Sequence, residues 1–265
     1  MIKDVGDMSE KEFQIILDQQ KYNLDQQRPI QKSILKKLKE QLEVELTQNS
    51  VAIEGSSLSV QEVGVILRHG ITVGGKPLRE HFEVINHLEA FYFIEQLIKN
   101  EKFFSEYDIK SIHSLVMKNL SDDAGSYRKG NVIITGAKHK PKESIFINQQ
   151  MEEFIYWYKG EAQSLHPIER AAKIHIIFVG IHPFSDGNGR TSRLLMNLEL
   201  LKAGFPITII KNENRLEYYQ YLDLAHTTGE FQPFLNFVYN CVQESFDIYG
   251  KVLGIDLKKN REMER

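Results

Sequence analysis

Twelve consecutive residues, from His182 to Arg193, carry side chains suited to phosphate chemistry. His182 is a candidate general base, because a neutral imidazole can take a proton from a hydroxyl. Asp186 is a candidate Mg²⁺ ligand, since this ion prefers a few protein oxygens together with phosphate and water. These types and spacings predict a site that holds a polyphosphate next to a hydroxyl that loses its proton.

The glycines and arginines of the same segment point to the anion itself. Gly187-Asn188-Gly189 predicts a tight turn that opens a helix, where exposed N–H groups and the helix dipole favour an anion. Arg190 and Arg193 lie one turn apart on that helix, so both can approach one anion, and arginine binds phosphate through two parallel hydrogen bonds. A diphosphate or triphosphate is the expected ligand.

Two simpler interpretations of this segment compete with the phosphate site. The glycines could form a plain turn, or His175, His182 and Asp186 could form a metal site with two histidines and a carboxylate. Both leave the two arginines unexplained. His175 is more simply accounted for by packing against neighbouring helices.

The composition excludes several classes of protein. The chain has 265 residues and a net charge of −3, so it shows no nucleic-acid footprint. No segment approaches eighteen uninterrupted apolar residues, so no membrane span is expected. The start of the chain lacks the apolar core of a signal peptide. Cys241 is the single cysteine, which suits a reducing compartment. We expect a cytoplasmic protein.

The elements that position the twelve residues are mainly α-helices. Apolar residues at helical spacing, serines that can cap helices, and Pro or Gly at helix ends predict where these helices lie. Helices are expected at about residues 10–23, 31–53, 60–69, 78–99, 106–118 and 149–159, then after Pro167, after Gly189, around 214–226 and from Pro233 onward.

Two segments break the helical pattern. Asn131 to Thr135 is rich in β-branched residues, Gly136 turns, and Ser144 to Ile147 could return, which predicts a β-hairpin. Ile71 to Pro77 predicts a small hairpin or loop. We divide the chain into an N-terminal helical arm (1–58), a main domain (59–250) and a charged C-terminal tail (251–265).

His182 to Arg193 resembles the signature of the Fic family, His-Pro-Phe-x-Asp/Glu-Gly-Asn-Gly-Arg-x-x-Arg, at every fixed position. The resemblance covers roughly Leu46 to Cys241. Leu165-His166-Pro167, Thr191 to Asn197 and Tyr218-Tyr219 are similar to animal Fic proteins that AMPylate an endoplasmic-reticulum chaperone. Without their membrane anchor and helical repeats, the chain is similar to stand-alone bacterial members. The resemblance implies a mainly α Fic-type domain with a short β-hairpin flap.

The resemblance also implies an activity, the transfer of AMP from ATP to a Ser, Thr or Tyr hydroxyl of a target protein. His182 would be the base, and Asp186 would hold Mg²⁺ (or Mn²⁺) between the α- and β-phosphates. Arg193 would reach the γ-phosphate. The rest of the phosphate-binding segment would be Gly187, Asn188, Gly189, Arg190, Thr191 and Ser192.

The family's flap covers the nucleotide and aligns the target by strand pairing. Here it would be Asn131 to Pro141, with Ile133, Ile134, Thr135 and Gly136 at the nucleotide; an ordinary surface hairpin is the alternative. Tyr218 and Tyr219 match positions near the adenine, although aromatic pairs in helices are often core residues. His226 is also expected there, where similar members often have asparagine.

Ser50 to Gly55 resembles the family's inhibitory motif, Ser/Thr-x-x-x-Glu-Gly/Asn, placed on an N-terminal helix. The resemblance implies a salt bridge from Glu54 to Arg193 that competes with the γ-phosphate. A simple helix stop at Glu54-Gly55 is the alternative. In the similar animal proteins this glutamate also helps water remove AMP, so de-AMPylation is a second expected activity.

Other functions remain open at this point. The same scaffold could transfer another phosphate-containing group, or serve as a nucleotide-sensing module that binds proteins without turnover. A DNA-binding regulator is disfavoured because no basic recognition helix follows the core. The helices between Glu62 and Phe93 have apolar faces that either support a homodimer or only cover the core.

Overall fold

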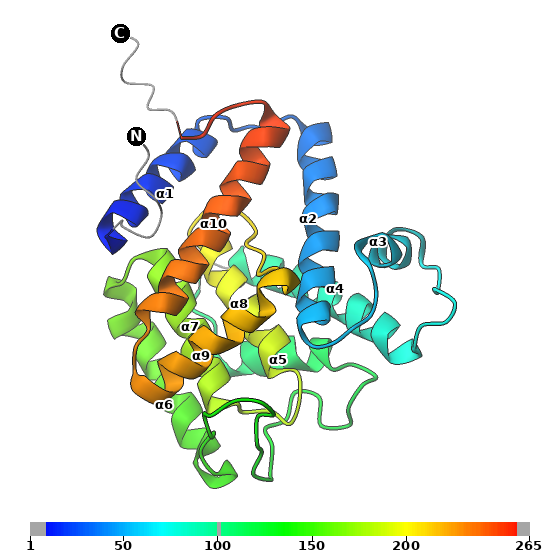
Figure 1. Cartoon of the computed structure of the whole chain (residues 1–265), viewed down its shortest axis with the longest axis vertical. Helices are drawn as coiled ribbons and strands as arrows, with labels where there is room; N and C mark the ends of the chain where they lie inside the picture. The colour runs from blue at the N-terminus through cyan, green and yellow to red at the C-terminus, as the bar shows by residue number, and fades with distance from the viewer. Residues whose placement is uncertain (1–8, 100–101, 259–265) are drawn as a thin grey trace.

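The computed structural model describes residues 9–99 and 102–258 (Figure 1). Within these ranges the secondary structure is helical, and no residue is in a β-strand. The α-helices are α1 (Glu10–Asp25), α2 (Lys32–Ile53), α3 (Val60–His69), α4 (Leu78–Ile98), α5 (Glu106–Val116), α6 (Ile147–Lys159), α7 (Pro167–Ile181), α8 (Asn188–Lys202), α9 (Arg215–Thr228) and α10 (Gln232–Leu253).

The prediction of a mainly helical chain is therefore confirmed, and most boundaries differ by one or two residues. Local capping explains this agreement. Ser9, Ser59 and Ser105 each form a capping box with an acidic residue three positions later. Residues 1–8 and 259–265 lie outside the described residues, and the second range is the end of the expected charged tail.

Helices α7 and α8 pack against each other at the centre and are joined by the short loop that contains the signature. Pro167 starts α7, where a missing N–H costs nothing. His182 ends α7 in the left-handed conformation (φ 52°), and Gly187 caps α8 in the same region (φ 77°). These two turns reverse the chain so sharply that the ends of both helices face one site.

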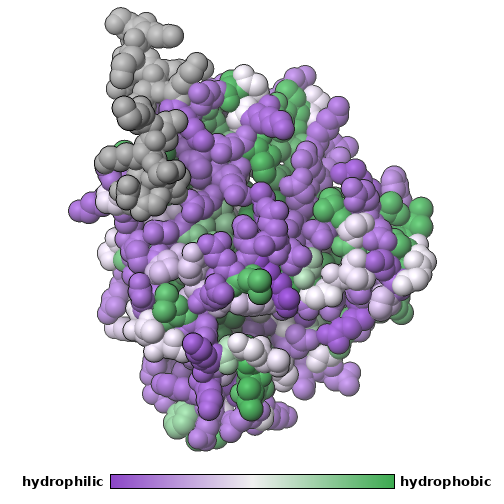
Figure 2. Space-filling model, in the orientation of Figure 1, coloured by the Kyte–Doolittle hydropathy of each residue, from purple (hydrophilic) through white to green (hydrophobic). Residues whose placement is uncertain are grey.

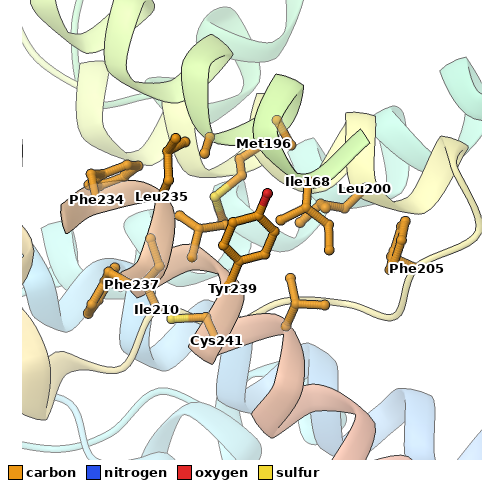
Figure 3. Close-up of a cluster of buried hydrophobic side chains, with 14 of the residues drawn as sticks. Ile168, Met196, Leu200, Phe205, Ile210, Phe234, Leu235, Phe237, Tyr239 and Cys241 are labelled. Carbon is orange, nitrogen blue, oxygen red and sulfur yellow. The ribbon is translucent and has the colours of Figure 1, made fainter. Parts of the chain in front are cut away.

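Two large apolar clusters fix these helices in place. In one, α10 packs between α1, α7 and α8; Figure 3 shows Tyr239 of α10 surrounded by Ile168, Met196 and Leu200. Phe13 of α1 stacks on the Tyr239 ring with centroids 5.4 Å apart. The other cluster joins α2, α4, α5 and α6 to the opposite side of α7 and α8. Burying each large apolar side chain contributes about 1.5–3 kcal/mol. The two helices that flank the signature loop are therefore firmly packed.

The predicted β-hairpin at 131–147 is wrong. Gly136 (φ 82°) does turn the chain, and Ala137 N–H donates to Ile134 O at 3.2 Å, but no ladder follows. The N–H groups of Lys138 and His139 instead donate to the Asp223 carboxylate, and Pro141 has no N–H to give. The expected returning strand is a 3₁₀ turn, Ser144–Phe146, that leads into α6.

The segment from Ile71 to Pro77 is a loop rather than a hairpin. Figure 2 shows a largely hydrophilic face on which hydrophobic residues are scattered. Among the described residues, no helix is long and apolar enough to cross a membrane.

Candidate functional site

His182 lies at the end of α7, and one of its ring nitrogens is hydrogen-bonded to the backbone. Its Nδ1 lies 3.3 Å from Val179 O, a carbonyl that can only accept, so Nδ1 carries the proton and Nε2 keeps a lone pair. Burial, helped by the charge of Arg128, lowers the pKa of His182 to about 4, even though the Val179 contact acts in the opposite direction. The ring is therefore neutral at pH 7, in the tautomer that a general base needs.

Asn188 shapes the loop rather than facing solvent. Its amide is 2% exposed and makes two hydrogen bonds with the Phe184 backbone, at 3.0 and 2.8 Å. Phe184 is itself buried and stacks on His113, with ring centroids 3.5 Å apart. The predicted phosphate contact of Asn188 would thus come from its backbone N–H. The first intrahelical bond of α8 is donated by Thr191 to Gly187 O, which leaves the preceding N–H groups open.

Arg190 is a buried guanidinium with unused donors. Its side chain is 2% exposed, and its Nη2 lies 3.3 Å from Asp186 Oδ1. Its Nη1 is 3.5 Å from a Glu83 oxygen, yet among the described residues neither Nε nor Nη1 has a hydrogen-bond partner. Buried polar groups are nearly always satisfied, so these orphaned donors indicate an anionic ligand. The predicted polyphosphate fits this requirement.

Asp186 is the exposed acidic residue of the loop, with a side-chain exposure of 51%. Its Oδ1 accepts from Gly187 N–H at 2.6 Å, and its Oδ2 accepts from Arg79 Nη2 at 3.0 Å. Burial raises the pKa of Asp186, but Arg190, the Gly187 N–H and Arg79 outweigh it, so the pKa lies below its usual value. The carboxylate is charged at neutral pH, as a hard metal ion requires.

Arg193 is held by the N-terminal segment. Its Nη2 lies 2.7 Å from Glu54 Oε1 and 2.8 Å from Ser50 O, and its Nε donates to Ser50 Oγ at 3.0 Å. Burial lowers the pKa of Arg193, but the Glu54 carboxylate outweighs this and raises it overall. The Glu54 carboxylate also lies against Gly189, where a Cβ atom would collide with it. Glu54 thus reaches both the second arginine and the glycine turn.

The residues expected near the adenine occupy two different environments. Tyr218 is buried, with its hydroxyl 3.3 Å from Arg193 Nη1 and 3.0 Å from His175 Nε2. Tyr219 is 38% exposed and donates to Ile53 O at 3.3 Å. The His226 Nε2–H donates to Ile176 O at 2.8 Å. Tyr218 is therefore mainly a core residue that supports Arg193, while Tyr219 and His226 keep partly open faces.

Several other predicted residues do not come to the loop through their side chains. Thr191 and Ser192 are fully buried, and Ser192 Oγ donates to Gly189 O at 2.8 Å. Ile133 is 85% exposed and lies with Ile134, Thr135 and Gly136 in the irregular segment that turns at Gly136. His175 is buried between helices, and among the described residues no cluster of three or more metal-ligating side chains exists. The alternative two-histidine metal site is thereby excluded.

Sequence reasoning missed four residues of the site. Arg79 and Glu83 come from α4, more than a hundred positions before Asp186, and no local pattern marks them. His139 and Asp223 tie the 131–141 segment to the helices. His139 Nε2–H donates to Gly180 O at 2.9 Å, and its ring lies 4.5 Å from that of His226.

These features define a helical protein in which a glycine turn opens a helix with two buried arginines, next to a neutral imidazole. The model of the Fic/DOC family matches residues 103–200. The chain is 35% identical over 243 residues to protein adenylyltransferase Fic of Aedes aegypti, which covers 88% of this chain and 48% of that protein.

Solved structures agree with this match. Fic-1 (residues 134–508) from C. elegans has a TM-score of 0.82 at 30% identity, over 92% of this chain and 73% of that chain. A Fic domain containing signaling protein from Bacteroides thetaiotaomicron has a TM-score of 0.82 at 25% identity, over 91% and 99%. The chain belongs to the Fic/DOC family, and it spans about half the length of the curated relatives it matches.

Proposed function

We propose that this chain is a protein adenylyltransferase, which transfers AMP from ATP to a Ser, Thr or Tyr hydroxyl of a target protein. One observation carries the proposal: α7 ends at His182, whose Nε2 keeps its lone pair, and the next helix begins with a buried arginine, Arg190, that has two donors without a partner among the described residues. Curated relatives named protein adenylyltransferase Fic support it.

The chemistry follows from these groups. His182 Nε2 accepts the proton of the target hydroxyl while the hydroxyl oxygen attacks the α-phosphorus of ATP. The new P–O bond forms as the bond to the β-phosphate oxygen breaks, and pyrophosphate leaves. The N–H groups at the start of α8 and the Arg190 guanidinium stabilise the phosphate charge. The proton then passes from the imidazolium to solvent, which restores the base.

Asp186 is the residue that would hold Mg²⁺ or Mn²⁺. Its carboxylate fits, because it is ionised and half-exposed and lies within one helical turn of Arg190. The ion would neutralise charge on the α- and β-phosphates and on the leaving pyrophosphate. The chain's own contribution is to fix the carboxylate through Gly187 N–H and Arg190.

Glu54 is the proposed brake on this reaction. It holds Arg193 at 2.7 Å, and a guanidinium bound in this way cannot serve a γ-phosphate equally well. Two anions would crowd one cation, and the triphosphate would settle in a pose unsuited to in-line attack. The domain limits of 58/59 and 250/251 are part of this proposal, with the arm as the carrier of the brake.

Three finer points complete the proposal. The target's main chain would dock along Asn131 to Pro141, in which residues 131–134 have no regular secondary structure and belong to no sheet. Glu54 could also orient water for the reverse removal of AMP, because its carboxylate reaches the glycine turn.

Exposed Leu78, Ile85 and Tyr92 on α4 offer a surface for a homodimer. Light scattering of Leu78→Asp against the parent tests that dimer.

Labelled ATP tests the function in a cell extract and in self-modification. The parent, Glu54→Gly and the double variant Glu54→Gly/His182→Ala are compared, and mass spectrometry identifies the adduct. We expect AMP transfer to rise in Glu54→Gly and to vanish in the double variant. Equal transfer in both would defeat the role of His182, and a different adduct mass would show transfer of another phosphate-containing group. Nucleotide binding without any adduct would indicate a sensing module.

Purified AMPylated target with Mg²⁺ or Mn²⁺ tests the reverse activity. We expect the parent to release AMP and Glu54→Gly to release none. If the parent releases no AMP, the proposed de-AMPylation is wrong, while the proposed AMP transfer is unaffected.

A further inference from the structure

Four charged side chains form a closed ring around the proposed metal ligand. Arg79 Nη2 lies 3.0 Å from Asp186 Oδ2, and Asp186 Oδ1 lies 3.3 Å from Arg190 Nη2. Arg190 Nη1 is 3.5 Å from Glu83 Oε1, which lies 3.1 Å from Arg79 Nε. Positive and negative groups alternate, and their formal charges cancel.

From this ring we infer that Arg79 is a tethered cation that occupies Asp186 Oδ2 and must leave it when a metal ion binds. The inference rests on the proposed function, in which Asp186 holds the metal. It concerns a residue of α4, outside the signature, that sets how easily the metal enters.

Arg79 is the displaceable member of the ring. Its side chain is 59% exposed, whereas that of Arg190 is 2% exposed and fixed between helices. Arg79 is also the second residue of α4, where the helix dipole disfavours a positive charge. Its contacts with the two carboxylates, rather than the helix, therefore hold it in place.

Asp186 has one oxygen that a metal ion can take from Arg79. Oδ1 is already bound by Gly187 N–H at 2.6 Å and by Arg190, while Oδ2 has Arg79 as its contact. A divalent ion at Oδ2 would repel the adjacent guanidinium, which retains Glu83 at 3.1 Å as an alternative partner. Metal entry thus exchanges one cation for another.

The expected effect is modest, because an exposed ion pair at 3.0 Å belongs to the upper part of the usual range for exposed pairs, about 0.4–1 kcal/mol. Removing Arg79 should therefore tighten metal binding by about two- to fivefold, at about 1.4 kcal/mol per tenfold.

Binding of Mn²⁺ in the presence of ATP, followed by electron paramagnetic resonance, tests the exchange without any turnover. All proteins carry Glu54→Gly and His182→Ala, which remove the brake and prevent transfer. Arg79→Gln, Arg79→Lys and Asp186→Asn are compared with this background. Arg68→Gln is the charge-matched control, since Arg68 is an exposed arginine in the last turn of α3. Circular dichroism and metal-free ATP binding confirm that each variant is folded.

We expect Arg79→Gln to lower the Mn²⁺ concentration at half-saturation by about two- to fivefold, with Arg79→Lys and Arg68→Gln near the background. Unchanged or weaker Mn²⁺ binding in Arg79→Gln overturns the inference, and weaker binding would make Arg79 a phosphate ligand instead. An equal gain in Arg68→Gln also overturns it, because the effect would then be a general change of charge. If Asp186→Asn binds Mn²⁺ as well as the background does, the proposed metal role of Asp186 falls as well. If Arg79→Gln leaves Mn²⁺ binding unchanged while Asp186→Asn weakens it, the proposed metal role of Asp186 stands and only the inference about Arg79 fails.

Discussion

At the scale of single residues, the site depends on which donors and acceptors are already hydrogen-bonded within the protein and which are left for a ligand. Val179 O fixes the tautomer of His182, and the Phe184 backbone binds the amide of Asn188. Both side chains are therefore held in one orientation. Arg190 shows the opposite, with buried donors left open. A ligand that supplies oxygen acceptors would satisfy them.

The pH dependence of AMP transfer follows from His182. The base works in its neutral form, and its pKa in the free protein is lowered to about 4, chiefly by burial. In the Glu54→Gly background we expect kcat/KM to stay level from about pH 8 to pH 5.5 and to fall below that, since kcat/KM reports the free enzyme. A pH–rate profile of initial rates at target concentrations well below KM measures this. An acid limb centred near pH 6.5 or above would contradict it.

Ser50 gives a graded test of the brake. Its hydroxyl accepts from Arg193 Nε at 3.0 Å, and its backbone carbonyl and Glu54 bind Nη2. Ser50→Ala removes only the first contact, worth about 1.5–3 kcal/mol for a charged donor. We expect self-modification to rise, but less than in Glu54→Gly. Measured initial rates in which Ser50→Ala equals the parent would show that the hydroxyl plays no part.

At the scale of elements, the 131–141 segment is attached to two helices rather than to a partner strand. Asp223 of α9 accepts from Lys138 N–H and His139 N–H, each at 2.8 Å, and the His139 ring reaches Gly180 O of α7. Gly180 leaves room for the His226 ring, which would have to shift if a Cβ atom stood 2.7 Å from its Nε2. The attached end of the segment therefore lies close to His182.

We expect Asp223→Ala to free this end of the segment. Amide hydrogen exchange at residues 138 and 139 should accelerate, because two bonds to a carboxylate are lost. The KM for a target protein should rise more than kcat falls, if the segment docks the target. Glu230→Ala, which removes an exposed carboxylate just beyond α9, is the control. Unchanged exchange at both amides would show that Asp223 does not anchor the segment.

At the scale of the whole molecule, buried histidines make stability depend on pH. Burial lowers the pKa of His87 to about 3 and of His113 to about 4, and it lowers that of His175 as well. The unfolded chain binds protons near pH 6.5 at these positions, while the folded chain does not. The free energy of unfolding is therefore fully retained above pH 6.5 and is lost as the pH falls toward 4.

Urea denaturation at pH 7.5 and pH 5.5 measures this loss. Each such histidine should contribute about 1 kcal/mol to the difference. His87→Gln should reduce the difference between the two pH values, whatever its effect on stability at pH 7.5, and exposed His69→Gln should not. A pH difference that His87→Gln leaves intact would contradict this account.

The sequence by itself determined what depends on neighbours along the chain. Capping boxes at Ser59 and Ser105 and the Pro167 helix start predicted helices that the structure contains, and the spacing from His182 to Arg193 predicted the turn between α7 and α8. The resemblance of Ser50 to Gly55 implied the contact of Glu54 with Arg193 that the structure contains.

Only the tertiary structure decided what depends on distant partners. β-Branched residues 131–135 favoured a strand, but a strand needs a ladder, and Asp223 takes the N–H groups that would have formed it. Arg79 reaches Asp186 because α4 packs against α8, a contact that no local pattern encodes. Propensity acts over a few residues, whereas hydrogen bonds and ion pairs go to whichever group the fold brings within reach.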